Sequence, residues 1–425
     1  MRVAVVTKIF PSSLEPLSAP FNRQQLSELA RQCDLEVLEA IPYVPFSRIT
    51  STPARAARLS ALPAGERIHG IDVTYVRQLY VPRVGLPVAV PLYLVSLLPH
   101  RERLSAADVV LATWAYPDGC ASALAARALG KPCVVKVHGS DVNVVLQQRA
   151  PRAVAARILP TADAVVAVSR PLADELVRLG VPSEKVHIVA NGVDASLFFP
   201  RDRTSSRKAL GLPEDARVLL FVGRLEAEKG VLDLLDAFGE VCARVPSALL
   251  ALVGDGVSMQ EVRARASRCR PDSVRVLGAL SHQDVAKWIG ACDALTLPSW
   301  AEGTPNVILE ALASGRPVVG TNVGGIPHVI VDPSCGALVA PRNPQALAEA
   351  LTRALHRHWD VEVIRRFGPG SWRQSADDLR RVLDLVVRDA RGSGSAPPAS
   401  ATESSAARHA TCRCRFDPVR HRGPA

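Results

Sequence analysis

The sequence is poor in aromatic residues, and it has no long uncharged hydrophobic run. Aromatic residues make up 4% of the 425 residues, which disfavours a nucleic-acid-binding surface built from stacking side chains. The longest uncharged run, residues 84–100, is shorter than the ~20 residues that a membrane-spanning helix needs, and it contains three prolines. We therefore predict a buried helix here, with an apolar surface that rests on a bilayer as the alternative.

Two further absences bear on where the protein works. The nine cysteines are an odd number and show no spacing typical of a disulfide framework or a structural zinc site. The apolar stretch at the N-terminus ends at Lys8, which makes it too short for the core of a signal peptide, and no cleavage site follows. We expect a first β-strand in this stretch and a cytoplasmic protein.

The length and the pattern of hydrophobic runs predict two domains. A chain of 425 residues is nearly three times the ~150 residues of a typical domain. Short apolar, β-branched runs alternate with helical stretches, which is typical of parallel sheets covered by helices. A polar, turn-rich break at about 191–215 separates two series. The first series comprises 3–7, 35–38, 73–76, 109–112, 134–137, 164–168 and 186–189, and the second comprises 218–222, 249–253, 274–277, 294–297, 317–321 and 336–339.

The predicted fold class is α/β, with two facing, Rossmann-like, doubly wound parallel-sheet domains and a cleft between them. We place the first domain at 1–195, the second at 196–371, and a helix that packs on the body at 372–391. Residues 392–425 are small, polar and proline-rich, so we expect a disordered tail. Ligands of open parallel sheets bind beyond the carboxyl ends of the strands, which points to the cleft.

The segment 298–327 holds two glutamates eight positions apart, Glu302 and Glu310. Glu302 follows a predicted strand, in a loop rich in glycine and proline. Glu310 lies about one turn inside a helix that begins near Pro305 or Asn306, so both side chains should face one strand-end cleft. A carboxylate at Glu310 could accept hydrogen bonds from the diol of a ribose, and the helix N-terminus suits sugar hydroxyls or a phosphate.

Two cations flank a glycine-bounded turn after another predicted strand. Arg224 leaves the strand end and Lys229 opens the next helix. The planar guanidinium and the ammonium are complementary for phosphate oxygens, so we predict a diphosphate clamp, whose attraction should strengthen as a leaving group gains negative charge. No Asp-x-Asp triplet and no metal-ligand spacing occurs in the sequence, so we expect no metal and no cofactor.

These segments together resemble glycosyltransferase family 4, whose members are retaining enzymes with two Rossmann domains, the GT-B architecture. The hallmark of that family is Glu-x7-Glu after Pro-Ser, which here is Glu302 and Glu310 after Pro298-Ser. Further blocks agree in order along residues 1–390, and the opening Phe10-Pro-Ser resembles a polysaccharide-biosynthesis branch. These blocks are Val137-His-Gly-Ser-Asp-Val, Asn191-Gly-Val-Asp, Val222-Gly-Arg-Leu, Glu228-Lys-Gly, Val253-Gly-Asp-Gly and Ala291-Cys-Asp.

The resemblance implies a role for each matched residue. Glu310 would hold the ribose, and Arg224 and Lys229 would hold the diphosphate. His138 would face the donor sugar from the opposite lobe, and Ser140 and Asp141 would shape that loop, with Asp141 meeting the acceptor as an alternative. The sugar hydroxyls would be bound by Glu302 and the stretch Gly303, Thr304, Pro305 and Asn306.

Two positions depart from the family pattern. The first loop, residues 11–20, lacks the usual pair of glycines, and His328 stands where the family has a glutamate. We expect His328 to place a titratable ring near the cleft.

The predicted function is a metal-independent, hexosyltransferase-type glycosyltransferase that moves a sugar from a nucleotide diphosphate sugar to a glycan or lipid-linked acceptor. The alternatives are a sugar phosphorylase, a nucleotide-sugar epimerase and a non-catalytic sugar-binding or nucleic-acid-binding protein. The net charge of +10 consists of +5 on residues 1–195, +1 on 196–390 and +4 on 391–425. The near-neutral second domain disfavours nucleic acid, so we expect the basic first domain to contact an anionic membrane on its inner face, or an acidic acceptor.

Overall fold

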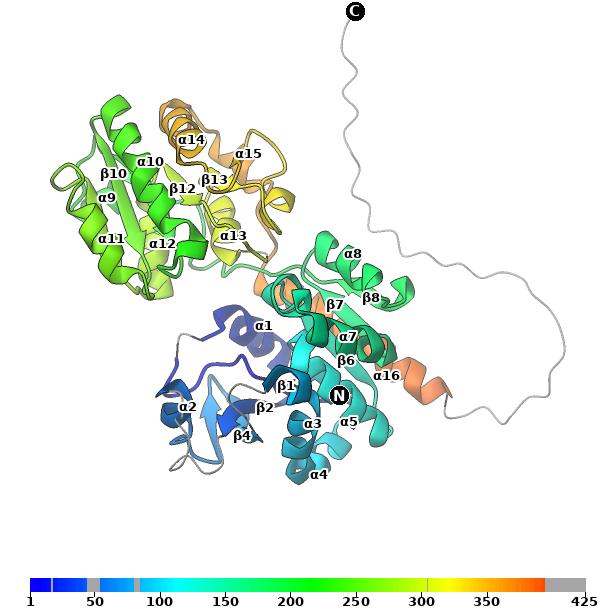
Figure 1. Ribbon diagram of the computed structural model, residues 1–425. Coiled ribbons are helices and arrows are strands. Elements are labelled where there is room, and N and C mark those ends of the chain that lie inside the picture. The colour runs from blue at the N-terminus through cyan, green and yellow to red at the C-terminus, as the bar shows by residue number, and fades with distance from the viewer. Residues whose placement is uncertain (17, 44–53, 80–84, 304, 394–425) are drawn as a thin grey trace, which may run out of the picture.

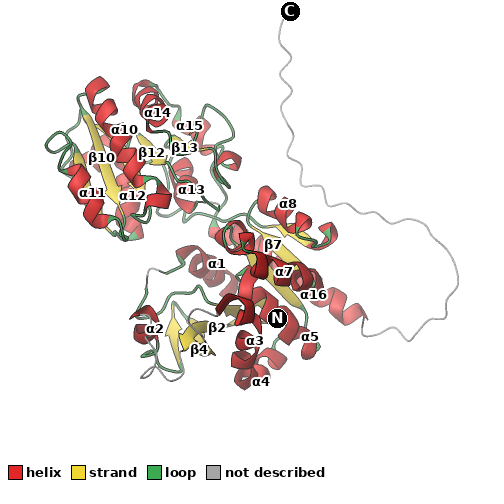
Figure 2. Cartoon of the chain, viewed as in Figure 1, coloured by secondary structure: helices red, strands yellow, loops and turns green. Residues whose placement is uncertain are grey.

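The computed structural model describes residues 1–16, 18–43, 54–79, 85–303 and 305–393, and in these residues it consists of two α/β domains (Figure 1). The first domain is built on an eight-stranded sheet of order β3-β4-β2-β1-β5-β6-β7-β8. The second is built on a six-stranded sheet of order β11-β10-β9-β12-β13-β14. Helices lie on both faces of each sheet (Figure 2). The predicted fold class is therefore confirmed.

Each of the seven strands predicted for the first domain is present. Its strands are β1 (Arg2–Thr7), β2 (Asp34–Tyr43), β3 (Gly65–Ile68), β4 (Ile71–Leu79), β5 (Val109–Ala112), β6 (Cys133–Val137), β7 (Ala164–Ala167) and β8 (Val186–Ile188). The central strand β1 pairs in parallel with β2 on one side and with β5 on the other. Nearly every side chain of β1, β5, β6 and β7 is buried, because helices cover both faces of the sheet.

The strand β3 is not among the predicted runs, and it makes the sheet mixed instead of purely parallel. It pairs antiparallel with β4 through a two-residue turn at His69 and Gly70. Both turn residues have positive φ angles, 49° for His69 and 82° for Gly70, as a tight hairpin turn requires. The sequence of β3 alternates between exposed and half-buried residues, so it lacks the apolar run on which the prediction relied.

The helices of the first domain connect and cover these strands. They are α1 (Pro20–Ala30), α2 (Ala54–Leu59), α3 (Gly85–Leu97), α4 (Arg101–Ala106), α5 (Cys120–Ala128), α6 (Ser140–Asn143), α7 (Arg149–Ile158) and α8 (Arg170–Arg178). The helix α3 is the run that we predicted to be buried or to rest on a bilayer. One face of α3 is buried through Val90, Tyr93 and Leu97, whereas Val95 is 51% exposed and the following Leu98 is 60% exposed.

The second domain contains all six strands predicted for it. They are β9 (Arg217–Val222), β10 (Ala248–Val253), β11 (Val274–Gly278), β12 (Ala294–Leu297), β13 (Val318–Thr321) and β14 (Gly336–Val339). Its helices are α9 (Arg203–Ala209), α10 (Val231–Arg244), α11 (Met259–Ala266), α12 (His282–Ala291), α13 (Asn306–Ala313), α14 (Pro344–His356) and α15 (Val361–Arg365). One hydrophobic core holds the sheet and these helices together.

The chain returns to the first domain through its last described helix, α16 (Trp372–Ser393), which lies against that domain in Figure 1. Apolar residues of α16, including Leu379 and Leu383, share a core with Val3 and Leu26. The predicted tail lies outside the described residues from residue 394 onward.

The chain passes from one domain to the other twice, near residues 192–193 and 370–372, and these two segments lie against each other. The N–H of Val193 donates to the carbonyl of Gly370 at 3.0 Å, and the N–H of Trp372 donates to the carbonyl of Val193. A Cβ at Gly192 would lie 2.4 Å from backbone atoms of Ser371 and Trp372, so this contact requires glycine. None of the described helices is both long and apolar enough to cross a membrane.

Candidate active site

A cleft of about 290 Å³ lies between the two domains. The second domain contributes the ends of β9 and β10, where Val222 and Val253 lead into glycine turns, so the cleft stands beyond the carboxyl ends of the strands. The first domain contributes residues before and within the first turn of α1. The lining consists of Pro16, Pro20, Arg23, Val222, Gly223, Arg224, Val253, Gly254, Asp255, Ala279, Leu280, His282, Val285 and Glu310.

Glu310 lies one turn inside α13, as predicted. The neighbours Ile308 and Leu312 are fully buried in the core of the second domain, which fixes the helix and directs Glu310 to the cleft. The Glu310 side chain is only 11% exposed, and its Oε1 lies 3.7 Å from Nε2 of His282, the first residue of α12. No hydrogen bond to this carboxylate is seen among the described residues, so its lone pairs remain available to a ligand in the cleft.

Arg224 follows β9 directly and lines the same cleft. Its side chain is 66% exposed, and its Nη1 donates to Oε1 of Glu226 at 2.8 Å. The turn that carries it is tight, because a Cβ at Gly254, where φ is 140°, would lie 1.8 Å from the carbonyl oxygen of Gly223. The turns after β9 and β10 therefore approach each other as closely as only glycine permits.

Lys229 and Glu302, both predicted to bind the donor, pair with each other. The Nζ of Lys229 lies 2.5 Å from Oε1 of Glu302, which also accepts a hydrogen bond from Oγ of Ser299 at 2.8 Å. Gly230, with a φ of 68°, follows Lys229, and a Cβ there would lie 1.9 Å from the carbonyl oxygen of Pro298. This contact holds the turn that carries Lys229 against the segment that carries Glu302.

Arg224 and Lys229, the two cations predicted to form a diphosphate clamp, have different carboxylate partners. Arg224 pairs with Glu226, and Lys229 pairs with Glu302. Of the two cations, Arg224 lines the cleft and Lys229 does not, so the clamp stays a prediction.

His138 follows β6 and is buried, with 8% of its surface exposed. Neither ring nitrogen has a hydrogen-bond partner among the described residues, and the ring packs against that of Phe21 at a centroid distance of 4.8 Å. Burial, reinforced by the nearby Lys136, holds the pKa of His138 well below its usual range. The imidazole is therefore neutral, with one donor and one acceptor unused.

Asp141 shapes the loop that carries His138. It is fully buried, and its carboxylate accepts hydrogen bonds from the backbone N–H groups of Ala115, His138, Gly139 and Val142. These bonds occupy the carboxylate oxygens, in agreement with the loop-shaping interpretation. Ser140 begins α6 and is exposed. The contact of these two residues with an acceptor stays a prediction.

The loop of His138 touches the loop of Glu302 across the domain interface. The Nδ2 of Asn143 donates to the carbonyl of Glu302 at 3.2 Å, and a Cβ at Gly303 would lie 2.9 Å from the carbonyl oxygen of His138. A second bridge runs from Nδ2 of Asn191 to Oδ1 of Asn306 at 2.9 Å. Pro305 precedes α13 as its N-cap residue, and Thr304 lies outside the described residues.

The cleft also contains residues that the sequence analysis did not single out, namely Arg23, Asp255 and His282. Asp255 lies in the turn after β10, and His282 begins α12 shortly after β11, so their position beyond strand ends was the available signal. His328 is exposed and does not belong to the lining of this cleft. In the described part of the chain, no three His, Cys, Asp or Glu side chains are grouped so that they could hold a metal ion.

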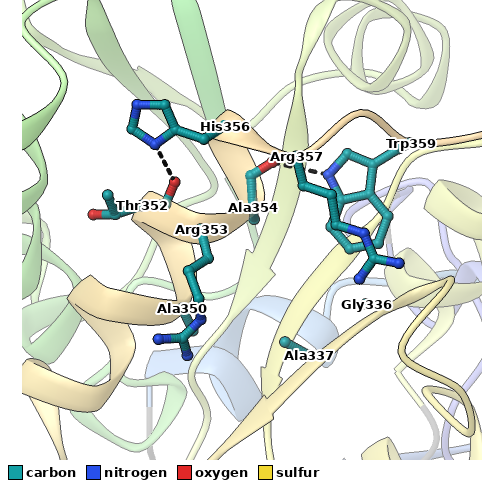
Figure 3. Close-up of a pocket in the computed structure, with 9 residues that line it drawn as sticks. All are labelled: Gly336, Ala337, Ala350, Thr352, Arg353, Ala354, His356, Arg357 and Trp359. Atoms are coloured by element: carbon teal, nitrogen blue, oxygen red, sulfur yellow. Dashed lines mark hydrogen bonds between the residues drawn. The ribbon is translucent and has the colours of Figure 1, made fainter.

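A larger pocket, of about 480 Å³, lies away from these residues, between β14 and the end of α14 (Figure 3). Its lining is largely apolar, and the guanidinium of Arg357 stacks at 4.3 Å over the ring of Trp359. None of the predicted site residues lines this pocket.

Comparison with known proteins agrees with this geometry. Residues 26–197 match the model of Glycosyltransferase Family 4, and residues 216–357 match that of Glycosyl transferases group 1. The teichuronic acid biosynthesis glycosyltransferase TuaC of Bacillus subtilis (strain 168) is 32% identical over 385 residues, which cover 85% of this chain and 92% of that protein. The chain belongs to glycosyltransferase family 4.

Other family 4 relatives cover smaller shares of this chain. A D-inositol 3-phosphate glycosyltransferase of Nocardioides sp. (strain ATCC BAA-499 / JS614) is 34% identical over 64% of this chain and 65% of that protein. The N-acetyl-alpha-D-glucosaminyl L-malate synthase of Bacillus anthracis is 30% identical over 63% of this chain and 69% of that protein. The solved structure of Anabaena Alr3699/HepE with UDP and glucose is similar with a TM-score of 0.63, 19% identity and coverage of 93% of this chain and 100% of that chain, a likeness of fold.

Proposed function

We propose that this glycosyltransferase is a retaining enzyme that moves a hexosyl group from a nucleotide diphosphate sugar to a hydroxyl of a glycan or lipid-linked acceptor. The observation that carries the proposal is the placement of Glu310 and Arg224 in one cleft beyond the strand ends. A buried carboxylate without hydrogen bonds to the described residues suits a ribose diol, and an exposed guanidinium suits a diphosphate. The structures of Anabaena HepE with UDP and with UDP-glucose support a nucleotide sugar as the donor.

In this proposal, each side chain of the site has one task. Glu310 holds the ribose, while Arg224 and Lys229 hold the diphosphate and stabilise the charge that develops as the sugar leaves. Glu302, paired with Lys229, accepts hydrogen bonds from sugar hydroxyls, together with the backbone of Gly303 to Asn306. His138 is neutral, so its ring can donate to one sugar hydroxyl or accept from another without adding a further positive charge to the site.

The chemistry is proposed to need no metal ion. The proposal assigns the diphosphate to two protein cations, Arg224 and Lys229, and electrostatic stabilisation of a leaving phosphate can come from such side chains as well as from Mg²⁺. The departing phosphate oxygen would take the proton from the acceptor hydroxyl on the same face, so that the site needs no separate general base.

The biological setting that we propose is the synthesis of a cell-surface polysaccharide or glycolipid at the inner face of the membrane. The relative TuaC is named for teichuronic acid biosynthesis, and two further relatives are named for D-inositol 3-phosphate and for L-malate. Each of these compounds is acidic, in keeping with the charge of +5 on residues 1–195.

Peripheral contact with the membrane would use the outer face of α3. Val88, Val95 and Leu98 are exposed there, and Arg101 follows them at the start of α4. Exposed apolar side chains next to cations are typical of surfaces that bind anionic bilayers.

The test of the donor site is calorimetry with a panel of UDP, GDP, ADP and their sugars. The exchanges Glu310→Ala and Arg224→Ala should each weaken binding of the accepted nucleotide roughly 10- to 150-fold, since each removes a hydrogen bond to a charged group or from one. Arg217→Ala is the matched control, because Arg217 begins the same strand β9 at its opposite end. Unchanged affinity in both site variants would overturn the proposal.

A further inference from the structure

Three side chains follow neighbouring strands at the carboxyl edge of the first sheet. Lys8 follows β1, Trp114 comes two residues after β5, and His138 follows β6. The strands β1, β5 and β6 are adjacent in the sheet, and adjacent strands lie about 4.8 Å apart. Lys8 and Trp114 therefore stand in one row with His138 along this edge of the sheet.

The ammonium group of Lys8 donates one long hydrogen bond to the described residues. Its Nζ donates to the carbonyl of Tyr116 at 3.4 Å and lies 5.0 Å from the centre of the Trp114 ring. The nearest carboxylate oxygen, Oδ2 of Asp118, is 4.0 Å away, beyond hydrogen-bond distance. An ammonium has three donors, so at least two remain for a ligand, and the Lys8 side chain is 31% exposed.

The residues around Lys8 hold polar atoms without partners. Asp118 is fully buried, and within the described part of the chain its Oδ2 accepts no hydrogen bond, while its Oδ1 accepts one from the hydroxyl of Tyr93 at 3.3 Å. The indole Nε1 of Trp114 is also buried without a partner, as are both ring nitrogens of His138. Buried polar atoms are almost always satisfied, so four unsatisfied atoms along one sheet edge indicate a place where a polar ligand or ordered water belongs.

We propose that Lys8 and Trp114 form an acceptor subsite beside His138, positioned by Asp118, and that this subsite takes a carbohydrate bearing a carboxylate or a phosphate. The inference rests on the proposed function, because it places the acceptor next to the side chain assigned to the donor sugar. The Lys8 ammonium binds the anionic group, and the indole of Trp114 offers an apolar ring face with a polar edge. Asp118 acts through Lys8, because its carboxylate is fully buried.

The test compares three sugars that differ only at C6: glucose, glucuronate and glucose 6-phosphate. Their binding to the full chain is measured by ligand-observed NMR, with and without UDP, for the wild type, Lys8→Met, Lys8→Arg and Lys131→Met. Lys131 is the matched control, because it precedes β6 at the opposite edge of the sheet. Glucuronate tests whether the subsite binds a carboxylate, and glucose 6-phosphate tests whether it binds a phosphate.

We expect at least one charged sugar to bind about tenfold more tightly than glucose, as a charge-assisted hydrogen bond provides. Lys8→Met should abolish this preference, while Lys8→Arg and Lys131→Met should keep it, and UDP should not displace the sugar. Three outcomes overturn the proposal: no preference for either charged sugar, an unchanged preference in Lys8→Met, or displacement by UDP, which would locate the anion in the donor cleft. If no nucleotide of the calorimetry panel bound, while the preference for a charged sugar still depended on Lys8, the result would contradict the proposed function and leave the subsite standing.

Discussion

The ammonium of Lys229 and the carboxylate of Glu302 form an ion pair at 2.5 Å, in which the Lys229 side chain is 19% exposed and that of Glu302 is 9% exposed. Breaking such a pair leaves one charge buried without its partner, which costs on the order of 2–4 kcal/mol of stability. The pair therefore links the stability of the second domain to the proposed donor site.

Lys229→Met should lower both donor affinity and stability, because it removes a phosphate ligand and strands the Glu302 carboxylate. The double variant Lys229→Met/Glu302→Gln should regain most of the stability and none of the affinity. Chemical denaturation and calorimetry on the same samples measure the two effects. If the double variant were no more stable than Lys229→Met, the pair would not couple the two residues.

His138→Leu should lower activity without lowering stability. The substitution removes two buried nitrogens that have no partner, so we expect the free energy of unfolding to stay the same or rise. The rate constant kcat should fall about 10²-fold, since one preorganised hydrogen-bonding group is lost from the sugar site. Steady-state kinetics beside thermal denaturation test this prediction, and a stable variant with full activity would contradict it.

Removal of divalent metal ions should leave turnover unchanged. Arg224 and Lys229 supply the positive charge at the proposed diphosphate position, so EDTA should not change the rate by more than about twofold. The measurement is product formation from a radiolabelled donor, in EDTA and in added Mg²⁺. A loss of activity in EDTA that Mg²⁺ restores would show that these two cations are insufficient.

Stability should depend on pH through Glu39, which lies on β2. Burial raises the pKa of Glu39 to about 9, above the value of about 4.3 expected in an unfolded chain. Between these values the native state binds more protons than the unfolded state, so stability falls as pH rises, by up to about 1.4 kcal/mol for each pH unit. Glu39→Gln should remove this fall. Unfolding curves at pH 5, 7 and 9 provide the test, and parallel pH profiles of the two proteins would contradict it.

Binding to anionic vesicles should depend on the outer face of α3. The double exchange Val95→Asp/Leu98→Asp should reduce co-sedimentation with phosphatidylglycerol vesicles, because it places two negative charges on the apolar stripe. Val257→Asp is the matched control, since Val257 is 90% exposed on the second domain. High salt should release the wild-type protein, and equal sedimentation of both variants would rule out α3 as the contact.

The positions of side chains that stand at the end of a strand or the start of a helix could be predicted from the sequence. Glu310 and Arg224 meet in the cleft because parallel strands end at one edge, and that edge can be inferred from apolar runs. Which side chains pair with each other could not be inferred in this way. The pairing of Lys229 with Glu302 depends on a backbone contact between Gly230 and Pro298, which are distant in sequence. The polar atoms without partners at His138 and Trp114 likewise depend on packing between β5, β6 and α1.

The return of α16 to the first domain determines how that domain can be isolated. Its apolar side chains complete the core around Val3 and Leu26, and Nε2 of Gln25 donates to Oγ of Ser375 at 2.8 Å in a buried contact. A fragment that stops at residue 195 would expose this core and should aggregate. The first domain is therefore discontinuous in sequence, and a version that joins residue 192 to residue 371 by a short linker should fold alone, because these residues already touch.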